Sequence, residues 1–204
     1  MTNGRTGAPL VTLLMTTLLL AGCGTPPWDE GASATASPVP SASPSPSASK
    51  PAEVQNDLAK GSAERTLTAG GVELAVTYFS TLDLGRWTPA ATKPLSLALS
   101  ASFADGSEQD IFLKQVRATV DVAAPDGPLP AAEPLVDQAS VAPGYLVTSP
   151  ISYSQVFTVP TLPPEATTLT LNLTYELLAP SAPKSKTYLK QSASDTLVIA
   201  LAGT

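Results

Sequence analysis

In the stretch Thr168-Leu169-Thr170-Leu171-Asn172-Leu173-Thr174-Tyr175-Glu176-Leu177, polar and apolar side chains alternate without interruption. Successive side chains of a β-strand point to opposite faces of a sheet, so this pattern indicates a strand with one buried and one wet face. The same period of two recurs around residues 72–78, 95–103, 116–122, 151–158 and 197–201. Such alternation is typical of antiparallel sheets, whereas an amphipathic helix would show a period of 3.6 residues.

Turn-forming dipeptides separate these segments. They are Asp105-Gly106, Asp126-Gly127, Pro143-Gly144 and Pro163-Pro164. Six or more short strands without a useful amphipathic helix predict an all-β fold, namely an immunoglobulin-like antiparallel β-sandwich covering residues 64–204. Trp87 follows the first of these segments, and we expect it to fill space between the two sheets.

The amino-acid composition excludes several classes of catalytic and metal-binding site. The chain has no histidine and one cysteine, and its two methionines, Met1 and Met15, lie near the N-terminus. Catalysis by Ser-His-Asp or Cys-His groups needs an imidazole, and the common zinc and copper sites need His, Cys or Met. A carboxylate-dependent hydrolase stays open as an alternative, but we expect no enzyme, no cofactor and no metal site.

The N-terminal residues 1–22 have the parts of an export signal. Arg5 precedes an apolar run from Leu10 to Leu20, and at about a dozen residues this run is short for a membrane span. The tetrapeptide Leu20-Ala21-Gly22-Cys23 resembles the lipobox of bacterial lipoproteins. That resemblance implies lipidation of Cys23, palmitate among the acyl chains, cleavage before it, and attachment to the cell membrane on the extracytoplasmic face.

Residues 23–63 follow as a lipidated cysteine and a linker rich in Ser, Pro and Ala. This composition lacks the apolar side chains that would offset the entropy of ordering, so we expect a disordered linker that holds the domain away from the membrane. The formal net charge of the chain is −6. An acidic chain repels phosphate backbones, so nucleic acid is not an expected partner.

The order of features between about Gly70 and Leu201 resembles a known family. These features are the serine-rich segment 95–103, the Asp-Gly turn, the segment 116–122, the loop Val141-Ala142-Pro143-Gly144, and Phe157-Thr158-Val159-Pro160 leading into 169–177. They are similar to the telokin-like immunoglobulin domains of actinobacterial and other Gram-positive lipoproteins. This resemblance implies an extracytoplasmic binding or interaction module without a catalytic motif.

Three further groups of residues are candidate sites. Asp105, Glu108 and Asp110 place three carboxylates around one turn, which suits either a hard cation such as calcium or, as we expect, a solvated turn. Asn172-Leu173-Thr174 matches a glycosylation sequon, but its place in a strand favours the polar face of a sheet. The lysines Lys184, Lys186 and Lys190 are either charged protection of a loop or edge, or a contact for an anionic wall polymer.

These observations favour a lipid-anchored, non-enzymatic binding or protein-interaction module of the cell envelope. Its expected partners are the membrane, through the lipid on Cys23, and an envelope protein or cell-wall polymer. The leucine-rich strands leave open a second class, a carrier that holds an apolar or glycolipid ligand between its sheets.

Overall fold

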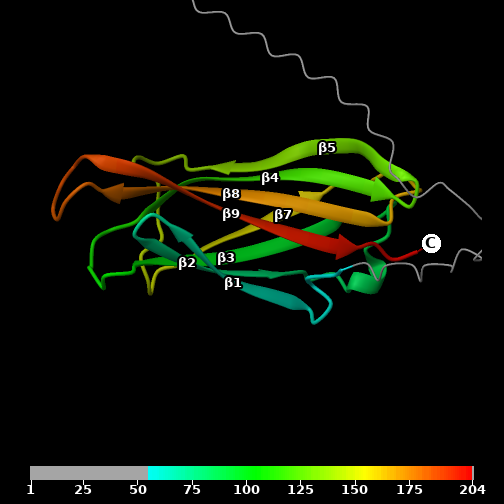
Figure 1. The fold of residues 1–204 in the computed structure, drawn as a ribbon, viewed down its shortest axis with the longest axis horizontal. Coiled ribbons are helices and arrows are strands. Elements are labelled where there is room, and N and C mark those ends of the chain that lie inside the picture. The colour runs from blue at the N-terminus through cyan, green and yellow to red at the C-terminus, as the bar shows by residue number, and fades with distance from the viewer. Residues whose placement is uncertain (1–54, 204) are drawn as a thin grey trace, which may run out of the picture. The chain divides into compact units, whose positions relative to one another are not determined.

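A computed structural model of the protein describes residues 55–203. They form two antiparallel sheets packed against each other, so the expected all-β sandwich is confirmed (Figure 1). The first sheet has the order β1 (Ser62–Ala69), β2 (Val72–Phe79), β3 (Lys93–Phe103) and β7 (Tyr153–Val159). The second has the order β5 (Gly127–Gln138), β4 (Phe112–Ala124), β8 (Thr168–Pro180) and β9 (Tyr188–Ala200). The short β6 (Tyr145–Leu146) pairs with β4, and the 3-10 helix η1 (Leu84–Arg86) lies between β2 and β3.

The connectivity is that of an immunoglobulin-like sandwich. The order β5-β4-β8-β9 corresponds to strands C′-C-F-G of that architecture, and the pairing of β3 with β7 corresponds to strands B and E. The chain crosses between the sheets from β3 to β4, from β5 to β7 and from β7 to β8. Loops far apart in sequence are therefore brought together at the two ends of the sandwich.

The core lies between the alternating inner faces of the two sheets. Its centre holds Tyr78 of β2 and Tyr175 of β8, whose hydroxyl oxygens lie 2.7 Å apart and share a hydrogen bond. Trp87 is fully buried, as expected, and its indole Nε1 donates to the hydroxyl of Ser80. The inner leucines of β3 and β8 pack around these groups. Burial of this apolar surface is the main source of stability for such a fold.

Most strands lie where the alternating pattern places them, and β8 and β3 contain their predicted segments entirely. Asn172 lies on the outer face of β8, where its amide donates to Asp121, so the sequon is part of the polar face of a sheet. Ile151 does not share the face of Tyr153 and Phe157. It lies in a turn before β7, where its amide donates to Thr148, and it is exposed.

The packed domain extends to the N-terminal side of residue 64, where the sequence analysis places its start. Leu58 is fully buried and β1 begins at Ser62. Residues 57–60 form turns. The predicted signal segment, Cys23 and most of the predicted linker lie outside the described residues.

Candidate functional site

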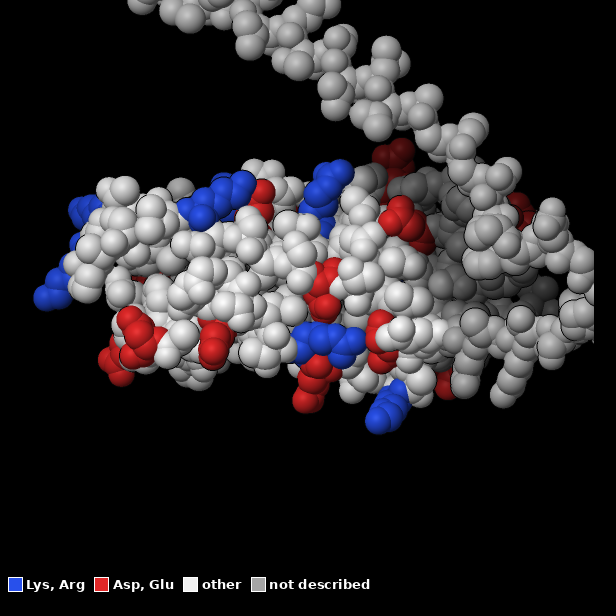
Figure 2. Space-filling view, in the orientation of Figure 1, with Lys and Arg blue, Asp and Glu red and all other residues white. Residues whose placement is uncertain are grey.

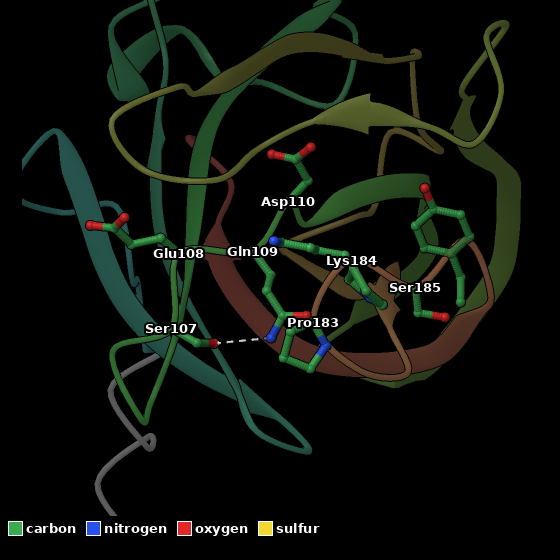
Figure 3. Close-up of a pocket in the computed structure, with 9 residues that line it drawn as sticks. Ser107, Glu108, Gln109, Asp110, Pro183, Lys184 and Ser185 are labelled. Carbon is green, nitrogen blue, oxygen red and sulfur yellow. Dashed lines mark hydrogen bonds between the residues drawn. The ribbon is translucent and has the colours of Figure 1, made fainter.

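A pocket of about 480 Å³ opens at one end of the sandwich (Figure 3). One wall is the segment Ser107–Asp110, which crosses from β3 to β4, and the other is the loop between β8 and β9. The second wall contributes Pro180, Pro183, Lys184, Ser185 and Tyr188. Two loops about 70 residues apart in sequence therefore build one concave surface because β4 and β8 are paired neighbours.

The pocket combines an aromatic ring with polar groups. The ring of Tyr188 packs edge-on against Phe112 of β4, with centroids 5.7 Å apart, so the ring is held in place. Gln109 donates weakly from its amide nitrogen to the Ser107 hydroxyl, while its amide oxygen is buried without a partner among the described residues. An aromatic surface beside charged groups is typical of sites that bind polar ligands or peptide segments.

Charges of both signs surround the pocket. Lys184 adopts a left-handed backbone conformation (φ 63°), and its side chain extends toward the Ser107–Asp110 wall (Figure 3). Glu108 and Asp110 lie on that wall and are exposed. The site therefore offers acceptors and one ammonium group together.

The three carboxylates flagged around the Asp-Gly turn do not converge. Asp105 turns toward its own loop and accepts a hydrogen bond from the Ser107 amide at 2.9 Å, which lowers the pKa of the Asp105 carboxyl. Glu108 and Asp110 line the pocket instead. Within residues 55–203, no three side chains of His, Cys, Asp or Glu form a group that could hold a metal ion.

The three flagged lysines also have separate positions. Lys190 forms an ion pair with Glu176 of the neighbouring strand at 2.7 Å, so its charge is locally balanced. Lys184 lines the pocket, and Lys186 lies in the same loop and is exposed. Figure 2 shows acidic and basic side chains interspersed over the visible face, with no extended area of one sign.

The opposite end of the sandwich receives the chain from the predicted linker. There Asp57 donates its backbone amide to the Val198 carbonyl at 2.8 Å, and its carboxylate accepts from the Val198 amide at 2.7 Å. Arg65 of β1 binds the same carboxylate at 3.1 Å. Tyr188 begins β9 and Val198 lies near its end, ten residues later. A strand rises about 3.3 Å per residue, so the linker junction and the pocket lie roughly 30 Å apart.

A second pocket of about 440 Å³ lies at the linker end and is lined by Ala59, Gly61 and residues 80–84. It has no aromatic ring and carries one ionisable side chain, Asp83, which caps the helix η1 by accepting from the Gly85 amide. This pocket therefore offers fewer groups for recognition than the one beside Tyr188.

The inner faces of the sheets are occupied by side chains of the core. The leucines that suggest a lipid carrier, such as Leu97, Leu99, Leu171 and Leu173, are buried against one another and against the central tyrosines. Besides the two pockets above, a smaller one is lined by residues 64–66 of β1 and 75–77 of β2, and another by the turn between β4 and β5 with Glu165. These positions favour a plain hydrophobic core as the role of the leucines.

Comparison with protein-family models and with curated proteins found no match for this chain. In the part of the chain that the structure describes, no helix is long and apolar enough to cross a membrane.

Sequence reasoning pointed to Lys184, Glu108 and Asp110 but not to Tyr188 or Gln109 as members of the same site. No local pattern marks these two residues, since the pocket exists only because two crossing loops meet. Lys93 is fully buried at the start of β3, and no local pattern in the sequence marks it either. Its flanking proline and threonine resemble those of an ordinary surface loop.

Proposed function

We propose that the protein is a lipid-anchored binding module on the extracytoplasmic face of the cell membrane and that it is not an enzyme. The observation that carries this proposal is the placement of the two ends of the sandwich. The chain enters at Asp57, and the pocket beside Tyr188 lies at the far end of β9. A domain tethered through its N-terminal side would therefore present the pocket away from the anchor.

In this proposal, Cys23 carries the lipid, and the segment from there to about residue 54 determines how far the folded domain can lie from the membrane. Two or more acyl chains hold a protein stably, because each buried methylene contributes about 0.8 kcal/mol. The ion pair of Asp57 with Arg65 and its bonds to β9 tie the end of the linker to the sandwich. Force or displacement at the anchor would then move the domain as one body.

The expected partner is an envelope protein or a cell-wall polymer. Tyr188 offers a fixed aromatic surface, and Glu108 and Asp110 offer exposed carboxylates on the facing wall. Lys184 adds an ammonium group that suits an anionic polymer or an acidic segment of a protein. Kinship with the telokin-like lipoprotein domains is part of this proposal, and the immunoglobulin-like strand order supports it only at the level of the fold.

Site-specific photo-cross-linking in intact cells tests the proposal. A cross-linking amino acid replaces Lys184 at the pocket or, as a matched control, Asp126, which is exposed in the β4–β5 turn at the linker end. We expect a saturable product from position 184, none from position 126, and loss of the product when Cys23→Ala removes the anchor. Equal capture from both positions would contradict the orientation, and unchanged capture with Cys23→Ala would contradict the anchor.

A further inference from the structure

The sandwich has four edge strands, and three of them are protected against pairing with another chain. An open edge exposes unpaired backbone groups and invites an additional strand. β5 carries Pro128, Pro130 and Pro134, which cannot donate to a partner strand. β9 is bound by Asp57 at Val198. β1 carries the charged pair Glu64 and Arg65.

The fourth edge, β7, has none of these protections. Its sequence Tyr-Ser-Gln-Val-Phe-Thr-Val contains no charge and no proline, and among the strands of residues 55–203 it pairs with β3 only. The Val156 side chain at its centre is 54% exposed. The Val156 amide donates to the side-chain oxygen of Gln155 at 2.8 Å, so this amide is directed to the free edge rather than to β3. Backbone groups of Ser154 and Thr158 face the same way, since alternate residues of a strand bond to the same side.

We propose that the free edge of β7 is a homodimer interface, at which two copies of the chain pair antiparallel about a two-fold axis at Val156. In this register Val156 lies opposite Val156 of the second copy, and Ser154 lies opposite Thr158. By symmetry, Thr158 lies opposite Ser154 of the second copy, which makes three pairs. Each pair exchanges two backbone bonds, so the interface contains about six hydrogen bonds. The amide of Val156 exchanges its contact with Gln155 for one with a backbone carbonyl.

The side chains of β7 fit this register on both faces. On the outer face, Val156 meets its own copy and Ser154 meets Thr158, combinations that stabilise antiparallel pairs. On the inner face, Gln155 lies opposite Phe157 and Tyr153 opposite Val159, so the partly or fully buried positions of one copy extend those of the other. No like charges oppose each other anywhere in the paired segment.

A second copy is the occupant that these observations favour over an unrelated strand. An isologous interface needs a surface that is complementary to itself, and β7 is self-complementary when it is reversed about its central residue. Pro150 and Pro160 bracket the strand, so the paired segment is limited to the residues between them. Pairing joins the two four-stranded sheets into one continuous sheet through the two copies of β7.

Sedimentation measurements on a form that begins at Gly24 test the proposal. Residues 55–203 bury one hydrophobic core of their own, so this form retains the whole folded domain. We expect a concentration-dependent monomer–dimer equilibrium. Val156→Lys would weaken the dimer at least about tenfold, because it places two ammonium groups directly opposite each other. Thr66→Lys, at an exposed position on the other edge of the same sheet, is the matched control and would leave the dimer unchanged.

Mixing charge variants provides a rescue. A mixture of Val156→Lys and Val156→Glu would form a heterodimer that is more stable than the homodimer of either variant. A wild-type form that stays monomeric at high micromolar concentration would overturn the proposal. A dimer that survives Val156→Lys, or that Thr66→Lys disrupts equally, would also overturn it.

Disulfide trapping tests the register, since a form that begins at Gly24 contains no cysteine. Val156→Cys would form an intermolecular disulfide, because the Cα atoms of a hydrogen-bonded pair lie about 5.5 Å apart, within the range of disulfides. Ser154→Cys alone would not, whereas a mixture of Ser154→Cys and Thr158→Cys would. Failure of the Val156→Cys form to cross-link, or equal cross-linking by Ser154→Cys alone, would overturn the register.

Discussion

Replacement of Lys93 by methionine tests how the loop end of the sandwich beside Trp87 is held together. Lys93 is fully buried, and its ammonium group lies within hydrogen-bond distance of four backbone carbonyls, those of Thr88, Pro89, Ala91 and Pro160. Burial lowers the pKa of this ammonium group, whereas the four carbonyl oxygens oppose the shift by stabilising the charge. The single cation joins the loop before β3 to the end of β7.

The size of the effect follows from the carbonyls that lose their donor. Two of the four keep a backbone donor, the amide of Ala91 or of Leu162. The carbonyls of Ala91 and Pro160 have Lys93 as their donor among the described hydrogen bonds. Both of these hydrogen bonds are part-buried, and each contributes about 0.5–1.5 kcal/mol, so losing the two costs about 1–3 kcal/mol. Methionine keeps the apolar stem and removes the cost of burying a charge, so we expect a loss of about 1–2 kcal/mol in the free energy of unfolding.

Urea unfolding of the form that begins at Gly24 provides the measurement. Trp87 reports on the core when the other tryptophan is replaced by Trp28→Phe. Lys186→Met, at an exposed lysine, is the matched control and would change the free energy of unfolding by less than about 0.5 kcal/mol. A Lys93→Met form as stable as the parent, or more stable, would refute the reasoning, because it would mean that the cost of burying the ammonium group exceeds the value of its four contacts.

Three further substitutions test other contacts of the fold. Tyr78→Phe leaves the buried Tyr175 hydroxyl without its partner and should lower the free energy of unfolding by about 1–2 kcal/mol, with part of the loss recovered in the double variant with Tyr175→Phe. Burial raises the pKa of both tyrosines, so above about pH 10 these side chains ionise in the unfolded chain before they ionise in the folded protein. The free energy of unfolding of the parent therefore falls above that pH. Urea unfolding at increasing pH should show a smaller fall for the double variant. Gly70→Ala should cost about 1–2 kcal/mol in urea unfolding, because Gly70 has φ 61° and its new Cβ would lie 2.5 Å from the Gln191 amide oxygen. Asp57→Ala removes the cap on the edge of β9 and should increase hydrogen exchange there, with a loss of about 1–2 kcal/mol; unchanged exchange would contradict the capping role.

The strands that could be predicted from the sequence are those with a fully buried face. β8 lies between two other strands and packs on the opposite sheet, so its leucines must alternate strictly. The strands that escaped prediction are β1, β5 and β6. β5 carries three prolines because it lies at an edge, where a backbone donor can be absent, and those prolines conceal the strand from pattern analysis.

The dipeptide Asp-Gly shows where local sequence information ends. Asp126-Gly127 closes the tight turn between β4 and β5, as a hairpin signal should. Asp105-Gly106 has the same composition, with Gly106 at φ 76°, yet it begins a segment that crosses to the other sheet. Which sheet receives the next strand is decided by the packing of the whole domain. Membership of Gln109 and Tyr188 in one pocket depends on that crossing and could not be predicted from either loop alone.

The edge position of β7 likewise could not be predicted from the sequence alone. The placement of Ile151, Tyr153 and Phe157 beside Ser152, Ser154 and Thr158 predicts a strand with one buried face. It contains no sign that the strand is an edge, because a central strand of a small sandwich would read the same way. Only the strand order makes the absence of charge and proline informative, since the other three edges carry a protection that β7 lacks. A protein that protects three edges and leaves the fourth self-complementary is expected to use that edge.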